Sequence, residues 1–134
     1  MPGYDSSHFR SLAPHLYRMA KLGPTDMEIV QCYENFTGGV LMSLVEHGLV
    51  KAEEANEVLV KENLIAPDGK MPLNTSGGNL AECYMHGLEL VIEAVHQIRG
   101  EAINQLKRND TAIVIGGPMV TPVSSLILGS EAAL

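Results

Sequence analysis

The sequence predicts an α/β fold in which a mixed β-sheet is layered with α-helices, and three observations lead to this prediction. Hydrophobic residues make up 46% of the 134 residues, which is enough for one core and one domain over residues 1–134. Aromatic residues make up only 4%, so the core must consist mainly of aliphatic side chains. Segments with helical spacing alternate with short segments rich in β-formers, and this alternation is typical of helices packed on a sheet.

The first half of the chain predicts a helix, a strand and two further helices. Apolar residues recur at helical spacing over 7–20, and the Gly-Pro pair at 23–24 ends that pattern. The segment 26–33 (DMEIVQCY) is short and rich in β-formers, which favours a buried strand. Two helices follow, one over 37–47 between a threonine cap and a glycine, and one over 51–62 with a single apolar face.

The second half predicts a short strand, a long helix and a final pair of strands. After a turn at 67–69, residues 73–75 are typical of a short strand, and apolar residues from 80 to 106 share helical spacing. The segments 111–115 (TAIVI) and 125–128 (SLIL) are two strands joined by a short connection. Antiparallel pairing of these two strands is therefore expected.

Charge and cysteine spacing exclude several kinds of partner. The formal net charge is -7, so the field of the protein repels nucleic acid and anionic lipid headgroups. Cys32 and Cys83 lie far apart without a CxxC neighbour, so we expect reduced thiols and no metal site. No apolar run approaches a membrane span, and residues 1–10 lack a basic segment followed by an apolar stretch, so a cytoplasmic protein is expected.

Two glycine-containing segments could carry chemistry. Asn74 opens the segment 74–78 (NTSGG) before the predicted long helix, so its backbone N–H groups could approach an anionic ligand. The alternative is ordinary turn chemistry, to which glycines are equally suited. Gly116 and Gly117 lie between the last two strands, where they form either a simple hairpin or a tight turn beneath an active site.

Tyr84 and His86 are titratable residues at the start of the predicted long helix. A helix N-terminus would favour a phenolate at Tyr84 and disfavour a protonated His86. By spacing, Tyr84 lies on the apolar stripe, so a core tyrosine with one bonded hydroxyl is the alternative. For His86 the alternative is a surface or hydrogen-bonded histidine.

Three stretches of the chain resemble one family. Residues 74–102 (NTSGG…QIRGEA) resemble the stretch of sterol-carrier-type thiolases in which N-x-x-G-G leads to G-H-P and then to a helix ending in Q-[IL]-[RQ]-G. Residues 32–49 resemble that family's segment built around H-D-C-F-S or Y-D-x-F-T, and residues 111–129 resemble its last two strands. The resemblance covers nearly the whole chain as the carboxy-terminal half of a thiolase-superfamily protein of the lipid-transfer type.

Departures from that family change the chemistry that the resemblance implies. Tyr84 stands where thiolases place the G-H-P histidine, and Tyr33 stands where they place the residue that anchors a catalytic water. Gly116, Gly117 and the Pro-Met pair after them replace the C-x-G-G-G turn that bears the second thiolase cysteine. Thiolysis is therefore not expected. The combination of Tyr-x-x-Phe-Thr with Tyr-x-His-Gly resembles thiolase-like aldolases that cleave steroid side chains as coenzyme A thioesters.

The resemblance also assigns roles to these residues. Retro-aldol cleavage of a 3-hydroxyacyl-CoA needs a base for the hydroxyl proton and a donor for the thioester enolate, and two tyrosines suit these roles if one phenol has a lowered pKa. Tyr84 would be the base or proton shuttle and Tyr33 its partner, and which phenol does which stays open. The supporting candidates are His86, Asn74, Gly116 and Gly117.

Partners and substrate follow from the same resemblance, because this half of the family lacks much of the coenzyme A site. We expect a coenzyme A thioester as substrate, no cofactor bound by this chain alone, an amino-terminal thiolase-like half or subunit, and a homo-oligomer. A small OB-fold and zinc-ribbon protein is a further implied partner. The alternative is a non-catalytic interaction or lipid-binding module in which the tyrosines fill a core, so whether the chain is an enzyme depends on the missing half.

Overall fold

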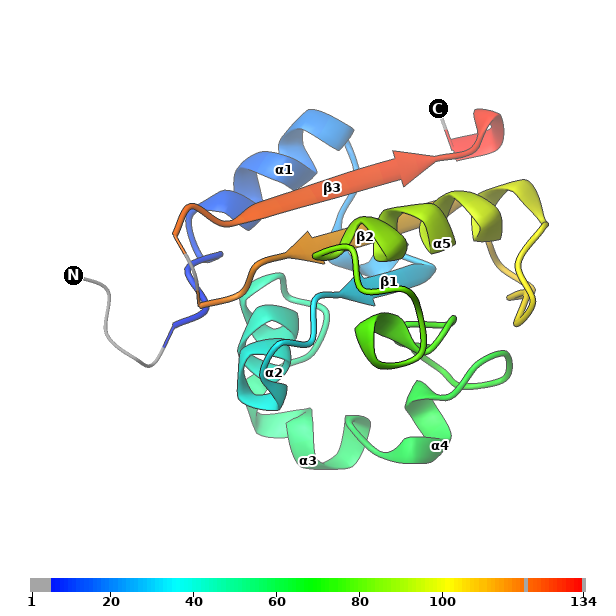
Figure 1. Cartoon of the computed structure of the whole chain (residues 1–134). Coiled ribbons are helices and arrows are strands. Elements are labelled where there is room, and N and C mark those ends of the chain that lie inside the picture. The colour runs from blue at the N-terminus through cyan, green and yellow to red at the C-terminus, as the bar shows by residue number, and fades with distance from the viewer. Residues whose placement is uncertain (1–5, 120, 134) are drawn as a thin grey trace.

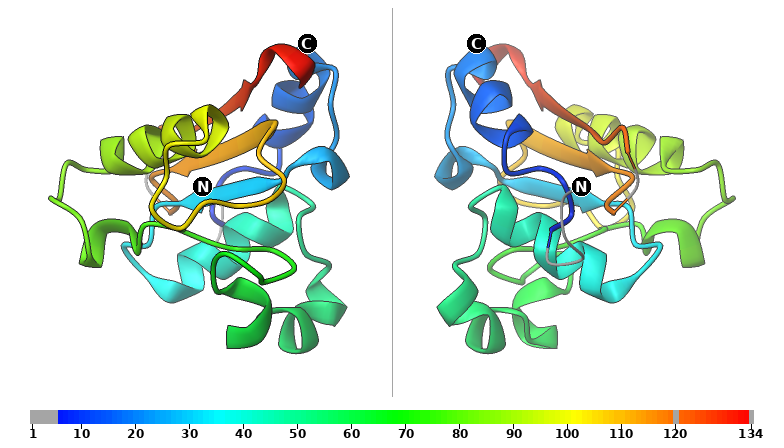
Figure 2. Two further views of the ribbon diagram at one scale, coloured as in Figure 1. Left: turned by 90° about the vertical axis from the view of Figure 1, so that its right-hand side faces the viewer. Right: turned by 90° about the vertical axis from the view of Figure 1, so that its left-hand side faces the viewer.

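A three-stranded mixed sheet lies between two layers of helices (Figures 1 and 2). In the computed structural model, which describes residues 6–119 and 121–133, the strands are β1 (Ile29–Cys32), β2 (Thr111–Gly116) and β3 (Ser124–Gly129), in the order β1-β2-β3. β1 is parallel to β2, and β2 is antiparallel to β3. The predicted α/β class and the predicted antiparallel pairing are both confirmed.

Helices cover β1 and β2 on both faces, which explains why nearly every residue of these two strands is buried. Successive side chains of a strand point to opposite faces. Val30 therefore packs with α1 (Leu12–Ala20) and α2 (Thr37–Glu46), whereas its neighbour Ile29 packs with α5 (Leu88–Arg99) on the other face. The two views in Figure 2 show α1 and α5 on opposite sides of the sheet.

The single helix predicted over 51–62 is wrong. The structure has a 3-10 turn at Ala52–Glu54 followed by two short helices, α3 (Ala55–Val58) and α4 (Lys61–Leu64). The backbone leaves the helical region at Leu59, where ψ is 57°. Short helices depend on tertiary packing for their stability, and only a few apolar side chains of this segment reach the core. One continuous helix is therefore not stabilised.

The long helix predicted over 80–106 is wrong in its length. Only the middle of that segment forms α5, which ends at Gly100 in the left-handed conformation with φ 72° that suits a glycine C-cap. Leu80 is 94% exposed and Ile103 is fully exposed, so neither belongs to the buried stripe of the helix. Apolar residues in the flanking loops extend the sequence pattern without extending the helix.

One predicted strand is shortened and another is absent. The strand predicted over 26–33 is reduced to β1, because Pro24–Asp26 forms a 3-10 turn ahead of it. The strand predicted over 73–75 is wrong, since Leu73 makes only an isolated parallel bridge, to Val30. The segment still lies beside β1, and this position matters for the site.

The sequence predicts neither a membrane-spanning segment nor a leader. Within the described ranges, no helix is long and apolar enough to cross a bilayer. Residues 1–5 belong to the stretch considered for a leader, and they lie outside the described residues.

Parallel strands end on the same side of a sheet, so β1 and β2 bring their carboxyl ends to one edge. Tyr33 directly follows β1, and its N–H donates to the Ile115 carbonyl at 2.8 Å. Gly116 ends β2. In open α/β sheets ligands bind at this edge. The loop from Asn74 and the turn that precedes α5 also reach it (Figure 1).

Candidate active site

The structure brings Tyr33 and Tyr84 together. Their hydroxyls form a direct, short hydrogen bond, and their ring centroids lie 6.4 Å apart with the planes tilted by 47°. Tyr33 is half-buried at the end of β1, and Tyr84 is 55% exposed in the loop before α5. The expectation that Tyr84 lies on the helical stripe is therefore wrong, and so is the alternative that it fills the core. The two tyrosines that the resemblance treats as partners thus lie in direct contact.

The pKa of Tyr33 is shifted upward. The hydrogen bond with Tyr84, burial, and the carboxylates of Glu89 and Glu34 together raise the pKa of Tyr33 to about 12. Each nearby negative charge disfavours a phenolate. The retro-aldol interpretation requires one phenol with a lowered pKa, and Tyr33 does not supply it in this structure. Tyr33 is instead a neutral phenol at physiological pH, which is the form that donates a hydrogen bond.

Asn74 fixes the backbone on which Tyr33 stands. Its Oδ1 accepts from the Cys32 N–H at 2.7 Å, and its Nδ2 donates to the Cys32 carbonyl at 2.8 Å and to Glu34 at 3.1 Å. The side chain thus continues the hydrogen-bonding pattern of β1 beyond the end of the strand. Asn74 has φ 50°, a left-handed conformation that asparagine adopts more readily than most residues. It anchors the backbone of Cys32, the residue directly before Tyr33.

Glu34 anchors the glycine loop (residues 74–79), and sequence reasoning missed this residue. Its carboxylate accepts from the backbone N–H of Asn79, from the Asn79 side chain at 2.9 Å, and from Asn74. A side chain at Gly78 would overlap that carboxylate, and Gly78 has φ 65°. This explains why the loop needs a glycine there. The available signal was a carboxylate directly after Tyr33, but its partners are remote in sequence.

The turn between Tyr84 and α5 places His86 beside the pair. The ring centroids of Tyr84 and His86 lie 4.8 Å apart, and His86 has φ 55°, which is uncommon for a residue with a side chain. Glu89 accepts from the N–H groups of Met85 and Gly87, each at 3.1 Å. Glu89 is the second residue that sequence reasoning missed, because a helical glutamate carries no signal for this contact.

Gly116 shares a cavity with His86, whereas Gly117 is not among the lining residues. The cavity measures about 390 Å³ and lies between the turn before α5 and the strands β2 and β3, with apolar walls that include Leu88, Val91 and Leu126. Gly117 has φ 66°, so glycine suits this turn.

Of the six predicted site residues, Tyr33, Tyr84, His86 and Asn74 form one group, and Gly116 borders it.

Metal ligands and thiols are the other side chains that could support catalysis. In residues 6–119 and 121–133, no group of three or more His, Cys, Asp or Glu side chains is arranged to hold a metal ion. Both cysteines are free, with Cys32 buried and Cys83 exposed. Burial raises the pKa of Cys32 to about 12, so this thiol is protonated and unsuited to nucleophilic attack at neutral pH.

The layered fold and the loops at the carboxyl edge of its sheet define a thiolase-type carboxy-terminal half. The family described as thiolase C-terminal domain-like matches residues 1–130, and the chain belongs to this family. It is 35% identical to the steroid side-chain-cleaving aldolase of Thermomonospora curvata over an alignment of 143 residues, gaps included. The alignment covers 96% of this chain and 36% of that protein. The family predicted from the motifs is confirmed.

Two further comparisons agree. The chain is 35% identical to a 17-hydroxy-3-oxo-4-pregnene-20-carboxyl-CoA lyase of Mycobacterium tuberculosis over 114 residues, covering 85% of this chain and 29% of that protein. The solved structure of an Ltp2-ChsH2(DUF35) aldolase superposes with a TM-score of 0.85 at 33% identity, covering 96% of this chain and 37% of that chain. This chain therefore spans only about a third of the length of these relatives.

Proposed function

We propose that this chain is the carboxy-terminal part of a thiolase-like aldolase that cleaves a 3-hydroxyacyl-CoA, with a steroid side chain or another branched acyl group as substrate. The observation that carries the proposal is the hydrogen-bonded phenol pair of Tyr33 and Tyr84 at the carboxyl edge of the sheet. The names of the two relatives, a side-chain-cleaving aldolase and a CoA lyase, support the reaction class.

The chemistry of the cleavage suits two phenols. A base removes the proton of the 3-hydroxyl, the bond between the α and β carbons breaks, the β carbon becomes a ketone, and the bonding electrons form a thioester enolate that takes a proton at the α carbon. The raised pKa of Tyr33 supports the role of neutral donor to the enolate. Tyr84, at the exposed end of the pair, is then the proposed base or proton shuttle.

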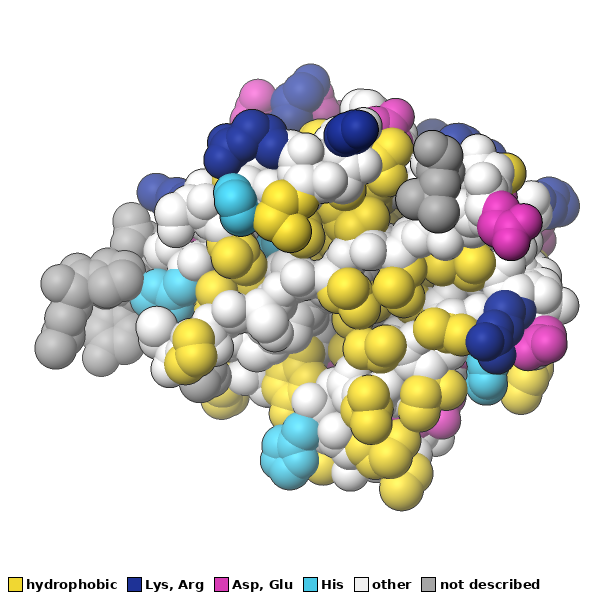
Figure 3. Space-filling model, turned by 90° about the horizontal axis from the view of Figure 1, so that it is seen from above, with side chains coloured by type: hydrophobic (Ala, Val, Ile, Leu, Met, Phe, Trp, Pro, Cys, Tyr) yellow, Lys and Arg dark blue, Asp and Glu magenta, His cyan; other side chains and the backbone are white. Residues whose placement is uncertain are grey.

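The proposal includes an amino-terminal thiolase-like half, joined in one chain or supplied as a subunit, that covers the apolar face beside the site. Figure 3 shows hydrophobic side chains gathered over β3 and α5, and the exposed ones include Leu88, Ile92 and Leu126 at 54, 40 and 40%. Apolar patches of this kind mark interaction surfaces. The relatives are almost three times longer than the segment they share with this chain, which supports such a covering half.

Further partners are proposed on the same basis. The similar solved structure is named for two components, Ltp2 and ChsH2(DUF35), and this supports an additional small partner, which we propose is of the OB-fold and zinc-ribbon type. We also propose a homo-oligomer, in which copies of the protein cover exposed apolar surface of one another. The cytoplasmic location rests on the sequence alone and stays a prediction.

Reconstitution tests this function. The chain is purified alone and together with the thiolase-like polypeptide that co-purifies from its native source, and both samples are given a steroid-type 3-hydroxyacyl-CoA and, separately, acetoacetyl-CoA with coenzyme A. We expect no activity from the isolated chain, and ketone with a shortened acyl-CoA from the complex, without thiolysis. A complex that cleaves neither substrate would leave the non-catalytic interaction module as the better account.

A further inference from the structure

Glu89 has a buried carboxylate inside the turn that carries Tyr84. It is the second residue of α5 and is only 3% exposed. Its side chain turns back out of the helix, so that Oε2 accepts from the Met85 N–H at 3.1 Å and both oxygens accept from the Gly87 N–H at 3.1 and 3.2 Å. Because Met85 and Gly87 flank His86, one carboxylate holds the whole turn.

We propose, on the basis of the function proposed above, that Glu89 is a positioning residue for the phenol pair. It fixes the turn 84–87 so that the Tyr84 hydroxyl meets the Tyr33 hydroxyl, and it adds a negative charge beside the two phenols. Glu89 itself touches neither tyrosine hydroxyl, so its effect is exerted through the turn and through its charge.

The turn contacts both tyrosines, so the hydrogen bonds that hold the turn also set the distance between the two hydroxyls. Tyr84 begins the turn and bonds to Tyr33. Gly87 ends it against the Tyr33 ring, where an added side-chain carbon would lie 3.0 Å from Cδ2. Gly87 has φ 93° and His86 has φ 55°, so two successive residues are in left-handed conformations. Such a turn persists only where its surroundings hold it, and the hydrogen bonds to Glu89 do so.

Two carboxylates face the phenol pair from different elements. Glu89 faces it from α5, and Glu34 faces it from the segment after β1, while the His86 imidazole lies against the Tyr84 ring. Glu34 is bonded to the glycine loop through Asn79, as Glu89 is bonded to the turn. Each carboxylate thus anchors one loop of the site, and both favour the protonated phenol of Tyr33.

The test is the ionisation of Tyr33, followed by NMR of the full chain labelled at tyrosine Cζ. At pH 11 a phenol with a pKa of about 12 is roughly one tenth ionised. In Glu89→Gln the charge is removed, and because this charge is a smaller cause of the raised pKa than the hydrogen bond with Tyr84 and burial, we expect the ionised fraction of Tyr33 to rise by about twofold. In Glu89→Asp the charge is kept but the shorter side chain cannot reach both amides. The bond between the tyrosines is then lost, and the fraction also rises.

Glu93→Gln is the matched control, because Glu93 lies one turn further along α5, is also buried at 7% exposure, and bonds to Thr75 and Gln97 instead of the turn. It should leave the ionised fraction of Tyr33 unchanged.

If Glu89 were only a helix cap, neither Glu89 variant would change the ionisation of Tyr33, and circular dichroism would show an intact fold. This result would overturn the proposal.

A measurement on the unmodified chain tests the proposal even if the variants fail to fold. The amide protons of Met85 and Gly87 lie outside α5, yet a carboxylate that holds them should slow their exchange with solvent to well below that of unbonded loop amides. Exchange at the unprotected rate would also overturn the proposal. Neither test needs substrate or the partner half, so their failure is distinct from a failure to observe aldolase activity.

Discussion

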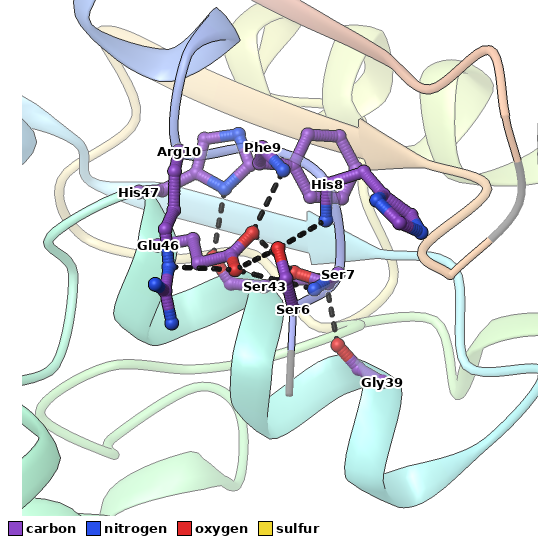
Figure 4. A network of polar contacts seen from close by, with 9 residues as sticks. All are labelled: Ser6, Ser7, His8, Phe9, Arg10, Gly39, Ser43, Glu46 and His47. Atoms are coloured by element: carbon purple, nitrogen blue, oxygen red, sulfur yellow. Dashed lines mark hydrogen bonds and ion pairs between the residues drawn. The ribbon is translucent and has the colours of Figure 1, made fainter. Parts of the chain in front are cut away.

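Two networks of this protein are built around a glutamate that gathers backbone N–H groups, and they differ in how completely their polar atoms are paired. Around Glu46 (Figure 4), the carboxylate accepts from the N–H groups of Ser7 and Phe9 at 3.2 and 2.7 Å and from the hydroxyls of Ser6 and Ser7 at 2.6 and 2.8 Å. Arg10 adds an ion pair at 3.2 Å, and the Glu46 side chain is 4% exposed. This network fastens segment 6–10 to α2.

The network beside the candidate site is incomplete by comparison. Glu34 is bonded to Asn74 and Asn79, yet among the described residues the buried side-chain oxygens without a partner are those of Gln31, Ser76 and Asn79. All three belong to β1 or to the glycine loop. Native structures rarely leave such atoms unpaired. The network around Glu46 is closed and stabilises the fold, whereas the network beside the exposed phenol pair leaves three buried oxygens open.

The largest expected effect comes from breaking the open region at its centre. Tyr84→Phe keeps the ring and removes the hydroxyl, so cleavage by the reconstituted complex should fall by roughly 10²–10⁴, the usual cost of losing a general acid or base. Steady-state kinetics on the complex measure this fall. Because Tyr84 is 55% exposed, the thermal stability of the chain should change little.

Tyr17→Phe is the control for that loss. The Tyr17 hydroxyl donates to the His47 carbonyl at 3.0 Å on the other face of the sheet, so its removal should leave the rate of cleavage unchanged. Full cleavage by Tyr84→Phe would show that the phenol pair is structural, and the comparison between an open and a closed network would then lose its functional meaning.

The same two regions explain what could be predicted from sequence. β2 was predictable because burial on both faces produces the continuous run TAIVI, and the meeting of Tyr33 with Tyr84 was predictable because the family motifs place both at one edge. The long helix was overextended because Leu80 and Ile103 are apolar yet exposed. Helical spacing counts apolar residues whether they are buried or exposed, so these two residues extended the predicted helix.

The carboxylates were not predictable for a different reason. Glu34 and Glu46 bond to loops 45 and 37–40 residues away, and their partners include the backbone N–H groups of Asn79, Ser7 and Phe9. Every residue except proline presents the same N–H donor, so no pattern in the sequence marks the partner. Glu89 lies near its partners, but it sits on α5 like any polar helical residue.

The second effect in size concerns the closed network. Glu46→Ala leaves several buried N–H and hydroxyl donors unpaired, so the free energy of unfolding should fall by about 3 kcal/mol. Denaturant titration measures this fall. Glu54→Ala is the control, since its ion pair with Lys51 is largely exposed and should contribute much less to stability. Equal losses in the two variants would contradict the distinction between a closed network and a surface pair.

A smaller effect is expected on the apolar face over β3 and α5. Leu88→Ala keeps a good helix former but removes an exposed apolar side chain, and it should weaken binding of the partner half by about tenfold. Leu41→Ala on α2 is matched, because Leu41 is 39% exposed and Leu88 is 54% exposed, and it should leave the affinity unchanged. Titration of the labelled chain with the partner half measures both, and equal affinities would place the interface elsewhere.

The smallest effect is the acid dependence of stability, which should proceed in two steps in the closed region. Burial lowers the pKa of His47 below its ordinary 6.5, despite the hydrogen bond to the Ser43 carbonyl. Burial raises the pKa of Glu46, but hydrogen bonds from Ser6, Ser7 and Phe9 outweigh it and lower the pKa below 4.5. In both cases the unfolded chain binds more protons than the folded chain, so stability decreases as the pH falls.

The two steps occupy different pH windows and can be separated by substitution. Stability should first decline below pH 6.5, where His47 of the unfolded chain becomes protonated while His47 of the folded chain stays neutral. It should decline again below pH 4.5, where Glu46 of the unfolded chain becomes protonated before Glu46 of the folded chain. Denaturant titrations at a series of pH values measure both slopes. His47→Gln should remove the first and Glu46→Gln the second. A first slope that persists in His47→Gln would mean that the buried histidine, held between Ser43 and Ser125, does not control it.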